Sequence, residues 1–159
     1  MSRLLVTIGA EDTRCSADDH EFSVPTGSRD LTSRELANDP PRPEELTNAI
    51  GFVTDHLDDL LREVPEAAGV PVVLTGPVAE AIAAVEVGHE PTLPMLLHRD
   101  AMEEVFRTLA TEASADRAKN PGLPAALVDT VVAGCCIAVA VMRRLHLDEI
   151  TIETGAVAP

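Results

Sequence analysis

The chain has 159 residues, enough for one ordinary domain with a sizeable core, and 45% of them are apolar. Its formal charge of −15, from 27 acidic and 12 basic residues, excludes the cationic footprint that nucleic acids and anionic membranes require. Three Phe and no Tyr or Trp leave few rings on which bases or sugars stack. We therefore expect an aliphatic core, no nucleic-acid partner and no membrane partner.

The cysteines and the N-terminus indicate a cytoplasmic protein. Cys15, Cys135 and Cys136 give no disulfide framework and suit a reducing compartment. The apolar run after Met1 is too short for a signal peptide, and acidic residues follow it at once. The run "VVAGCCIAVAVM", residues 131–142, is shorter than the roughly 18 residues that span a bilayer, which favours a buried core helix.

The first 25 residues predict three short strands. Apolar side chains alternate in "LLVTI", residues 4–8. The segments "DTRCS", residues 12–16, and "HEFSV", residues 20–24, are separated by a polar turn, which indicates an antiparallel meander. Pro25 and Gly27 then interrupt the pattern before a short helical turn.

The middle of the chain predicts a helix, a strand and a second helix. Residues 43–64 carry apolar side chains at steps of three and four, with proline and two glutamates in the first turn. Residues 70–76 form an apolar run that ends at Gly76, and Pro77 opens the next helix. This strand–glycine–helix junction is a place where backbone N–H groups can meet an anion.

The second half of the chain predicts two more helices and a last strand. Residues 88–96 are expected to form a loop, residues 99–113 an amphipathic helix, and residues 120–124 a turn. Residues 123–147 predict a long helix that is apolar almost all round, and residues 148–152 a closing strand. The fold class is therefore α/β, a mixed five-stranded sheet with three antiparallel strands first, flanked by helices.

This order is that of the ribonuclease-H-like lobe found in actin and sugar kinases. Three segments further resemble the second, C-terminal lobe of the exopolyphosphatase/guanosine pentaphosphate phosphatase (Ppx/GppA) family: "FSVPTGSRDLTSRELANDPPRPEEL", "VVLTGPVAEAIAAV" and "NPGLPAALVDTVVAGCCIAVAVMRRLHLDEITI". The last is the most specific, with Pro121-Gly122-Leu123 before Asp129 and Gly134. The resemblance implies a single actin-type lobe over residues 1–159, without the first actin-like lobe that carries the family's catalytic base.

The resemblance also places two phosphate loops, and both depart from the family pattern. Where the family has Asp-Ile-Gly-Gly-Gly-Ser, residues 7–12 read Thr-Ile-Gly-Ala-Glu-Asp. Thr7 replaces a possible ligand of a cation or water, and Ala10 and Glu11 replace glycines that let backbone N–H groups approach phosphate. Asp12 replaces a hydroxyl group. Two like charges about 4 Å apart repel by roughly 4 kcal/mol at an effective dielectric near 20, so acidic residues here oppose phosphate binding.

In the second loop, Pro77 removes one N–H donor from the anion site. We therefore expect no catalytic residue and no metal ligand in this chain. The degenerate phosphate loops are assigned to Thr7, Gly9, Glu11, Asp12, Thr75 and Gly76.

Acidic clusters offer two alternative metal sites, each with a simpler explanation. Glu11 and Asp12 have the paired carboxylates that Mg²⁺ prefers, but we interpret them as part of a polar turn. Asp55, Asp58 and Asp59 surround His56 on a predicted amphipathic helix. We interpret that cluster as a solvated helix face.

The remaining reactive residue types form no catalytic pattern in the sequence. The five histidines show no HxxxH or HExxH spacing, and no serine lies in a GxSxG motif. His89 and His98 flank the loop at residues 88–96 and are the only histidines we single out. We interpret Cys135 and Cys136 as core residues and Gly134 as a point of close helix packing.

Three functions follow from these observations. The first is a non-catalytic family lobe that acts as a binding, regulatory or assembly module without a cofactor. The second is a hydrolase of phosphoanhydrides, polyphosphate or guanosine penta- and tetraphosphate, which uses Mg²⁺ and is completed by a dimer or a separate first lobe. The third is a structural acidic domain with no ligand. For the first, we expect a homo-oligomer or a protein partner on the face of the absent lobe.

Overall fold

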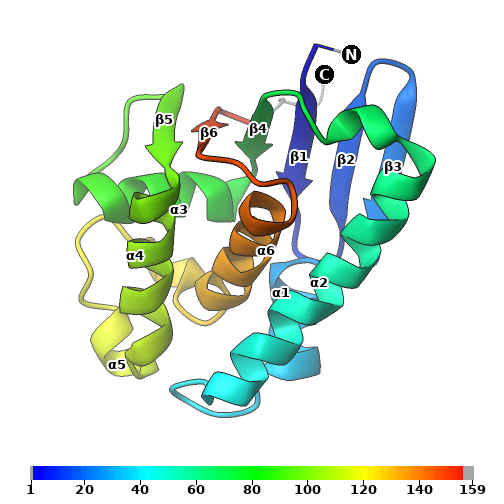
Figure 1. The fold of residues 1–159 in the computed structure, drawn as a ribbon. Helices are drawn as coiled ribbons and strands as arrows, with labels where there is room; N and C mark the ends of the chain where they lie inside the picture. Colours follow the sequence, from blue (N-terminus) through cyan, green and yellow to red (C-terminus); the bar gives the residue numbers. More distant parts are fainter. Residues whose placement is uncertain (1, 156–159) are drawn as a thin grey trace.

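A six-stranded mixed sheet organises the computed structural model, which describes residues 2–155 (Figure 1). The strand order is β3-β2-β1-β4-β6-β5, with β3 at one edge and β5 at the other. Strands β1, β4 and β6 are parallel, and the other neighbouring pairs are antiparallel. The strands are β1 Leu4–Ile8, β2 Thr13–Ala17, β3 His20–Val24, β4 Val72–Thr75, β5 Met95–His98 and β6 Glu149–Ile152.

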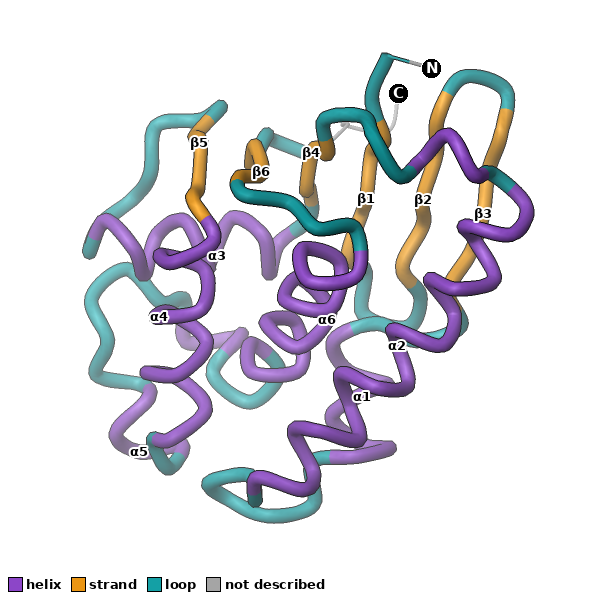
Figure 2. The backbone as a smooth tube through the Cα atoms, in the orientation of Figure 1, coloured by secondary structure: helices purple, strands orange, loops and turns teal. Residues whose placement is uncertain are grey.

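The helices all follow β3 and precede β6 in the sequence. They are α1 Ser28–Glu35, α2 Pro43–Glu63, α3 Pro77–Val87, α4 Arg99–Thr111, α5 Ser114–Arg117 and α6 Val131–Arg144, with short 3-10 turns η1 Pro65–Ala67 and η2 Ala125–Leu127. Helix α6 lies between α2 and α4 and contacts both, as well as α1 and α3 (Figures 1 and 2). Residues 131–142 are all almost fully buried, as expected for an apolar core helix. Among residues 2–155, no helix combines the length and the apolar character needed to cross a bilayer.

Strand β1 confirms the alternating burial that the sequence predicts. Leu4, Val6 and Ile8 are at most 1% exposed, whereas Leu5 and Thr7 between them are only partly buried. One face of β1 therefore packs against the core, which fixes the register of the strand because a slip of one residue would turn these side chains out.

Two elements differ from the sequence-based expectation. The sheet has six strands instead of five, because β5 forms within and just after the expected loop and pairs antiparallel with β6. Its four residues give little periodicity, and only Leu97 is buried while Leu96 is 50% exposed. The long helix begins at Val131 and not at residue 123, because residues 125–127 form a 3-10 turn. The polar pair Asp129-Thr130 directly before Val131 was the available signal for this start of the helix.

Helices α3 and α6 approach each other closely at Gly134. A Cβ atom at this position would lie 2.0 Å from Cγ1 of Val78. The glycine therefore serves helix packing, as the sequence suggested, and it places α3 against the centre of the core.

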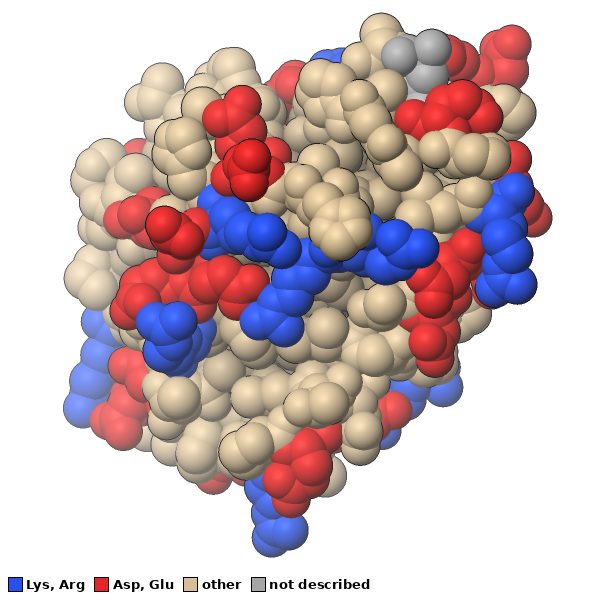
Figure 3. Space-filling model, viewed as in Figure 1, with Lys and Arg blue, Asp and Glu red and all other residues tan. Residues whose placement is uncertain are grey.

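Most of the basic residues pair with acidic ones, which are more than twice as numerous. Figure 3 shows Lys and Arg groups on the viewed face with Asp and Glu beside them. Ten of the 12 basic residues lie within 4.0 Å of a carboxylate, all inside the described residues 2–155. Most acidic groups are left without a cation, so the surface is predominantly negative.

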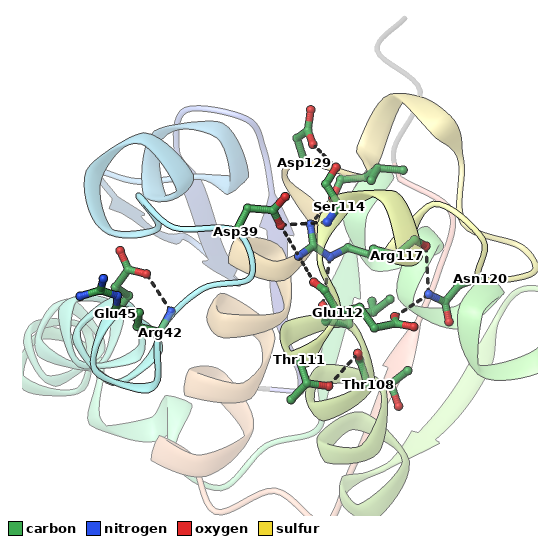
Figure 4. Close-up of polar contacts among 12 residues, drawn as sticks. Asp39, Arg42, Glu45, Thr108, Thr111, Glu112, Ser114, Arg117, Asn120 and Asp129 are labelled. Atoms are coloured by element: carbon green, nitrogen blue, oxygen red, sulfur yellow. Dashed lines mark hydrogen bonds and ion pairs between the residues drawn. The ribbon is translucent and has the colours of Figure 1, made fainter.

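One buried cation, Arg117, joins three loops near the ends of α4 and α6 (Figure 4). Its side chain is 5% exposed. Nε donates to the carbonyl of Leu109 (3.0 Å), Nη1 to that of Val128 (2.9 Å) and Nη2 to that of Glu112 (2.7 Å). Oδ1 of Asp39, from the loop between α1 and α2, lies 3.7 Å from Nη2 and balances the charge.

Ser114 continues this cluster. Its N–H donates to Oδ1 of Asp39 (2.8 Å), and its Oγ donates to Oδ1 of Asp129 (3.1 Å). A cavity of about 260 Å³ adjoins the cluster and is partly lined by these side chains. Because Arg117 donates to three main-chain carbonyls, we interpret the cluster as a structural clamp on the loops around α6.

The Gly134 contact predicts opposite effects for the same substitution at two helical glycines. Gly134→Ala is expected to destabilise the protein by about 1–2 kcal/mol, since overpacking against Val78 exceeds the gain in helix propensity. Gly51→Ala in α2, where an added Cβ meets nothing within 4 Å, is expected to stabilise by about 0.5–1 kcal/mol. Urea unfolding measures both, and a neutral Gly134→Ala would contradict the contact. In a Val78→Ala background the cost of Gly134→Ala should disappear.

The Arg117 clamp predicts a large loss of stability when the guanidinium is removed. Arg117→Ala leaves buried carbonyls without donors and should lower the free energy of unfolding by about 3 kcal/mol. Arg107→Ala is the control, because Arg107 pairs with Glu104 on an exposed helix surface and should change stability by no more than about 0.5 kcal/mol. Equal effects of the two substitutions in urea unfolding would rule out the clamp.

Candidate functional site

The turn between β1 and β2 stands where the sequence places the first phosphate loop. Its N–H at Gly9 donates to the carbonyl of Asp12 (2.9 Å), which closes the turn. A Cβ at Gly9 would lie 2.9 Å from that same carbonyl oxygen, so the tight closure favours glycine. The turn thus keeps a compact backbone path although the residues after Gly9 are larger than glycine.

The N-terminus of α1 packs directly onto this turn. The N–H of Ser28 donates to the carbonyl of Gly9 (2.8 Å), and the N–H groups of Arg29 and Asp30 donate to that of Ala10 (2.9 and 3.1 Å). Amides in the first turn of a helix have no partner within the helix and are the usual donors to a bound anion. In this protein the carbonyls of the β1–β2 turn occupy them.

Gly27 allows this close approach. A Cβ at this position would lie 2.3 Å from the carbonyl oxygen of Gly9 and 2.5 Å from the carbonyl carbon of Ala10. The segment before α1 is anchored as well, because Thr26 is fully buried and its Oγ1 donates to Oδ2 of Asp30 (2.7 Å). That hydrogen bond, together with Arg34, holds the pKa of the Asp30 carboxyl below its usual range.

The two acidic side chains of the turn point to separate arginines. Oε1 of Glu11 lies 3.0 Å from Nη1 of Arg29, and Oδ2 of Asp12 lies 3.3 Å from Nε of Arg14. Both pairs are exposed and contribute little to stability. Across residues 2–155, no group of three or more His, Cys, Asp or Glu side chains is arranged to hold a metal ion.

The second loop, between β4 and α3, lies against the end of β1. Gly76 has φ +111°, and a Cβ there would lie 2.4 Å from the carbonyl oxygen of Ile8. Glycine is therefore required both for the backbone conformation and for the space. Pro77 follows as the first residue of α3 and offers no N–H.

The hydroxyl groups of Thr7 and Thr75 satisfy each other. The two residues are partners on the parallel strands β1 and β4, and their Oγ1 atoms lie 2.9 Å apart. Thr75 is buried, so the bond fixes a polar pair between the two loops. The sequence resemblance aligns Thr7 with an aspartate of the family, and the Thr7 hydroxyl is engaged within the sheet.

A cavity of about 270 Å³ lies between the two loops. Gly9, Ser28 and Arg29 line one side, and Pro77 lines another. Of the six predicted loop residues, only Gly9 contributes to the lining, and Thr7, Glu11, Asp12, Thr75 and Gly76 do not line it. The other lining residues are Ile8, Ala10, Val78, Ala126, Leu127 and Thr130.

Sequence reasoning missed the contribution of α1 and η2 to this cavity. Arg29 is the charged side chain of the lining, and Ala126 and Leu127 close the cavity from a segment far along the chain. A glycine followed by the N-terminus of a helix, at Gly27, was the available signal for the first of these contacts. No local pattern indicated the second.

The other residues singled out in the sequence lie apart from this cavity. Asp58 pairs with Arg144 (2.5 Å) and Asp59 with Arg62 (2.6 Å), so the acidic cluster of α2 is divided among separate ion pairs. The ring of His56 packs edge-on against Phe52, with centroids 5.0 Å apart.

His89 contacts its chain neighbour, and His98, the last residue of β5, contacts the adjacent strand β6. Nδ1 of His89 is 2.8 Å from the carbonyl of Glu90, and Nδ1 of His98 is 3.9 Å from Oε2 of Glu149. Neither lines the cavity between the loops.

All three cysteines are buried and free, as expected for core residues. Burial raises the pKa of the Cys15 and Cys136 thiols to about 12 and raises the pKa of Cys135 as well. A thiol with so high a pKa is protonated near neutral pH and is a poor nucleophile.

Solved structures share this fold. An exopolyphosphatase-like protein aligns with a TM-score of 0.87 at 20% identity, over 97% of this chain and 55% of its own. A Ppx/GppA enzyme from Aquifex aeolicus aligns with a TM-score of 0.83 at 20% identity, over 97% of this chain and 54% of its own. An exopolyphosphatase from Cytophaga hutchinsonii gives 0.83 at 16% identity, over 96% and 53%.

The chain thus spans about half the length of the structures it matches, and the shared part has the ribonuclease-H-like, actin-type fold. Comparison with curated proteins finds no significant match. The model of the Ppx/GppA phosphatase family matches residues 16–158, nearly the whole chain. This protein therefore belongs to the Ppx/GppA phosphatase family.

Proposed function

We propose that this chain is a non-catalytic member of its family and acts as a binding module in the regulation or assembly of other proteins. The observation that carries the proposal is the bonding of the first α1 amides to the carbonyls of Gly9 and Ala10. An anion at this loop would have to break these hydrogen bonds before it could use the same donors.

Charge supports the same conclusion. Glu11 and Asp12 place two carboxylates on the turn, and the chain carries a formal charge of −15. A polyphosphate or a guanosine penta- or tetraphosphate approaching this turn meets repulsion, which only a cation could offset. Mg²⁺ is therefore a cofactor only in the hydrolase alternative, and the module itself needs none.

One observation favours a second function. This is a phosphoanhydride hydrolase that is completed by another lobe or by a second copy. The cavity between the two loops places Arg29 beside the N-terminus of α3, a position suited to a phosphate oxygen. The chain belongs to a phosphatase family, and the solved structures that it matches are about twice as long. Both facts also support this alternative. The free cysteines favour a cytoplasmic location for either function.

Phosphate release distinguishes these functions. Purified protein with Mg²⁺ and polyphosphate, or with guanosine penta- and tetraphosphate, is expected to release no inorganic phosphate above the protein-free rate. The assay should run over a series of protein concentrations, so that activity completed by a dimer is detected as a steeper than linear dependence.

Glu11→Gln is the matched variant for this assay, because it removes one turn carboxylate and keeps the size of the side chain. If wild-type protein releases phosphate and Glu11→Gln abolishes the release, the module proposal is refuted in favour of the hydrolase. Calorimetric titration with polyphosphate should likewise give no saturable heat for either protein.

A further inference from the structure

An apolar groove of about 630 Å³ runs along the outer side of α3, opposite the segment that precedes α6. Its floor is formed by Ala81 and Ala84, which are 2% and 5% exposed. Pro91, Pro124 and Leu127 form its walls. The groove adjoins the cavity between the two loops, since Pro77, Ala126 and Leu127 line both.

The local sequence builds this groove and keeps it open. Gly122 has φ +90°, and a Cβ there would lie 2.5 Å from the carbonyl oxygen of Ala84. Only glycine lets this loop lie so close to α3. Alanine at positions 81 and 84 leaves the floor without long side chains to fill it, and proline in both walls restricts their movement.

The rim of the groove is acidic without any neutralising cation. Glu80 and Glu90 are the charged residues of its lining, and neither forms an ion pair among residues 2–155. The two segments that build it contain no Lys or Arg, since residues 64–98 and 120–142 lack both. An apolar floor with an exclusively negative rim complements an apolar side chain flanked by positive charge.

We propose that this groove docks a segment of another protein that presents one or two large apolar side chains flanked by Arg or Lys. The inference rests on the proposed role as a binding module and names the chemistry of its partner. A second copy of this chain is the poorer occupant, because it brings a further formal charge of −15. Glu80 and Glu90 would then face a surface of the same sign.

A selection with random peptides tests the groove without assuming a partner. A phage-displayed library of random 12-residue peptides is selected on the full chain, and the enriched peptides are synthesised. The expected consensus has a large apolar residue with Arg or Lys on either side. Its NMR chemical-shift changes should fall on residues 77–91 and 122–127, and its affinity should decrease as salt increases.

Two neighbouring substitutions in η2 give a matched pair. Ala126→Arg places a long cationic side chain in the groove and should weaken peptide binding at least tenfold. Ala125→Arg introduces the same side chain one residue away, outside the lining, and should leave the affinity within twofold. Glu80→Lys should weaken binding and reduce its salt dependence.

Several results would overturn the proposal. These are a failure to enrich any peptide, a consensus without basic residues, shifts outside the groove, or equal effects of Ala125→Arg and Ala126→Arg. A concentration-dependent dimer abolished by Ala126→Arg would assign the groove to a second copy instead. The phosphate-release assay is independent of this readout, so hydrolytic activity would refute the non-catalytic role while the peptide data still decide the groove.

Discussion

The contact between the β1–β2 turn and the N-terminus of α1 is the constraint on which the candidate site depends. Gly27 lets the two backbones meet, and three amides of α1 then donate to two carbonyls of the turn. These are main-chain interactions and involve no side-chain atom of the turn. They also satisfy donors that would otherwise be left without partners within the helix, which stabilises the start of α1.

The same reasoning extends to the second loop. Gly76 brings the β4–α3 junction onto the end of β1, and Pro77 begins the helix without a free N–H. Thr7 and Thr75 complete the arrangement by bonding to each other between the two strands. At both loops, groups that could otherwise contact a phosphate are engaged within the fold, and this common pattern is the basis of the proposed non-catalytic role.

Sequence reasoning succeeded where a local pattern determines the structure. Alternating burial in β1 and the apolar stripe of α2 follow directly from their periods of two and 3.6 residues. It failed at β5, whose four residues are too few to show a period, and at the start of α6, where the apolar residues before Asp129-Thr130 form a 3-10 turn and not part of the helix.

The residues of the candidate site likewise fall into those that a local pattern predicts and those that tertiary packing brings together. Gly9 and Gly76 mark strand ends and could be placed from sequence, because a glycine after an apolar run is itself a signal. Arg29 and Leu127 could not, since their positions depend on how α1 and η2 pack onto the two loops. Contacts between segments roughly 20 to 120 residues apart arise from tertiary packing and leave no spacing in the chain.

The shared lining of the cavity and the groove links the two parts of the proposal. Pro77, Ala126 and Leu127 separate a small cavity beside Arg29 from a larger apolar groove with an acidic rim. A protein segment seated in the groove would contact these same residues and cover the adjoining side of the cavity. Under this proposal, the end of the sheet that holds the β1–β2 turn and the β4–α3 junction forms part of a protein-binding surface, a role that requires no phosphate donors.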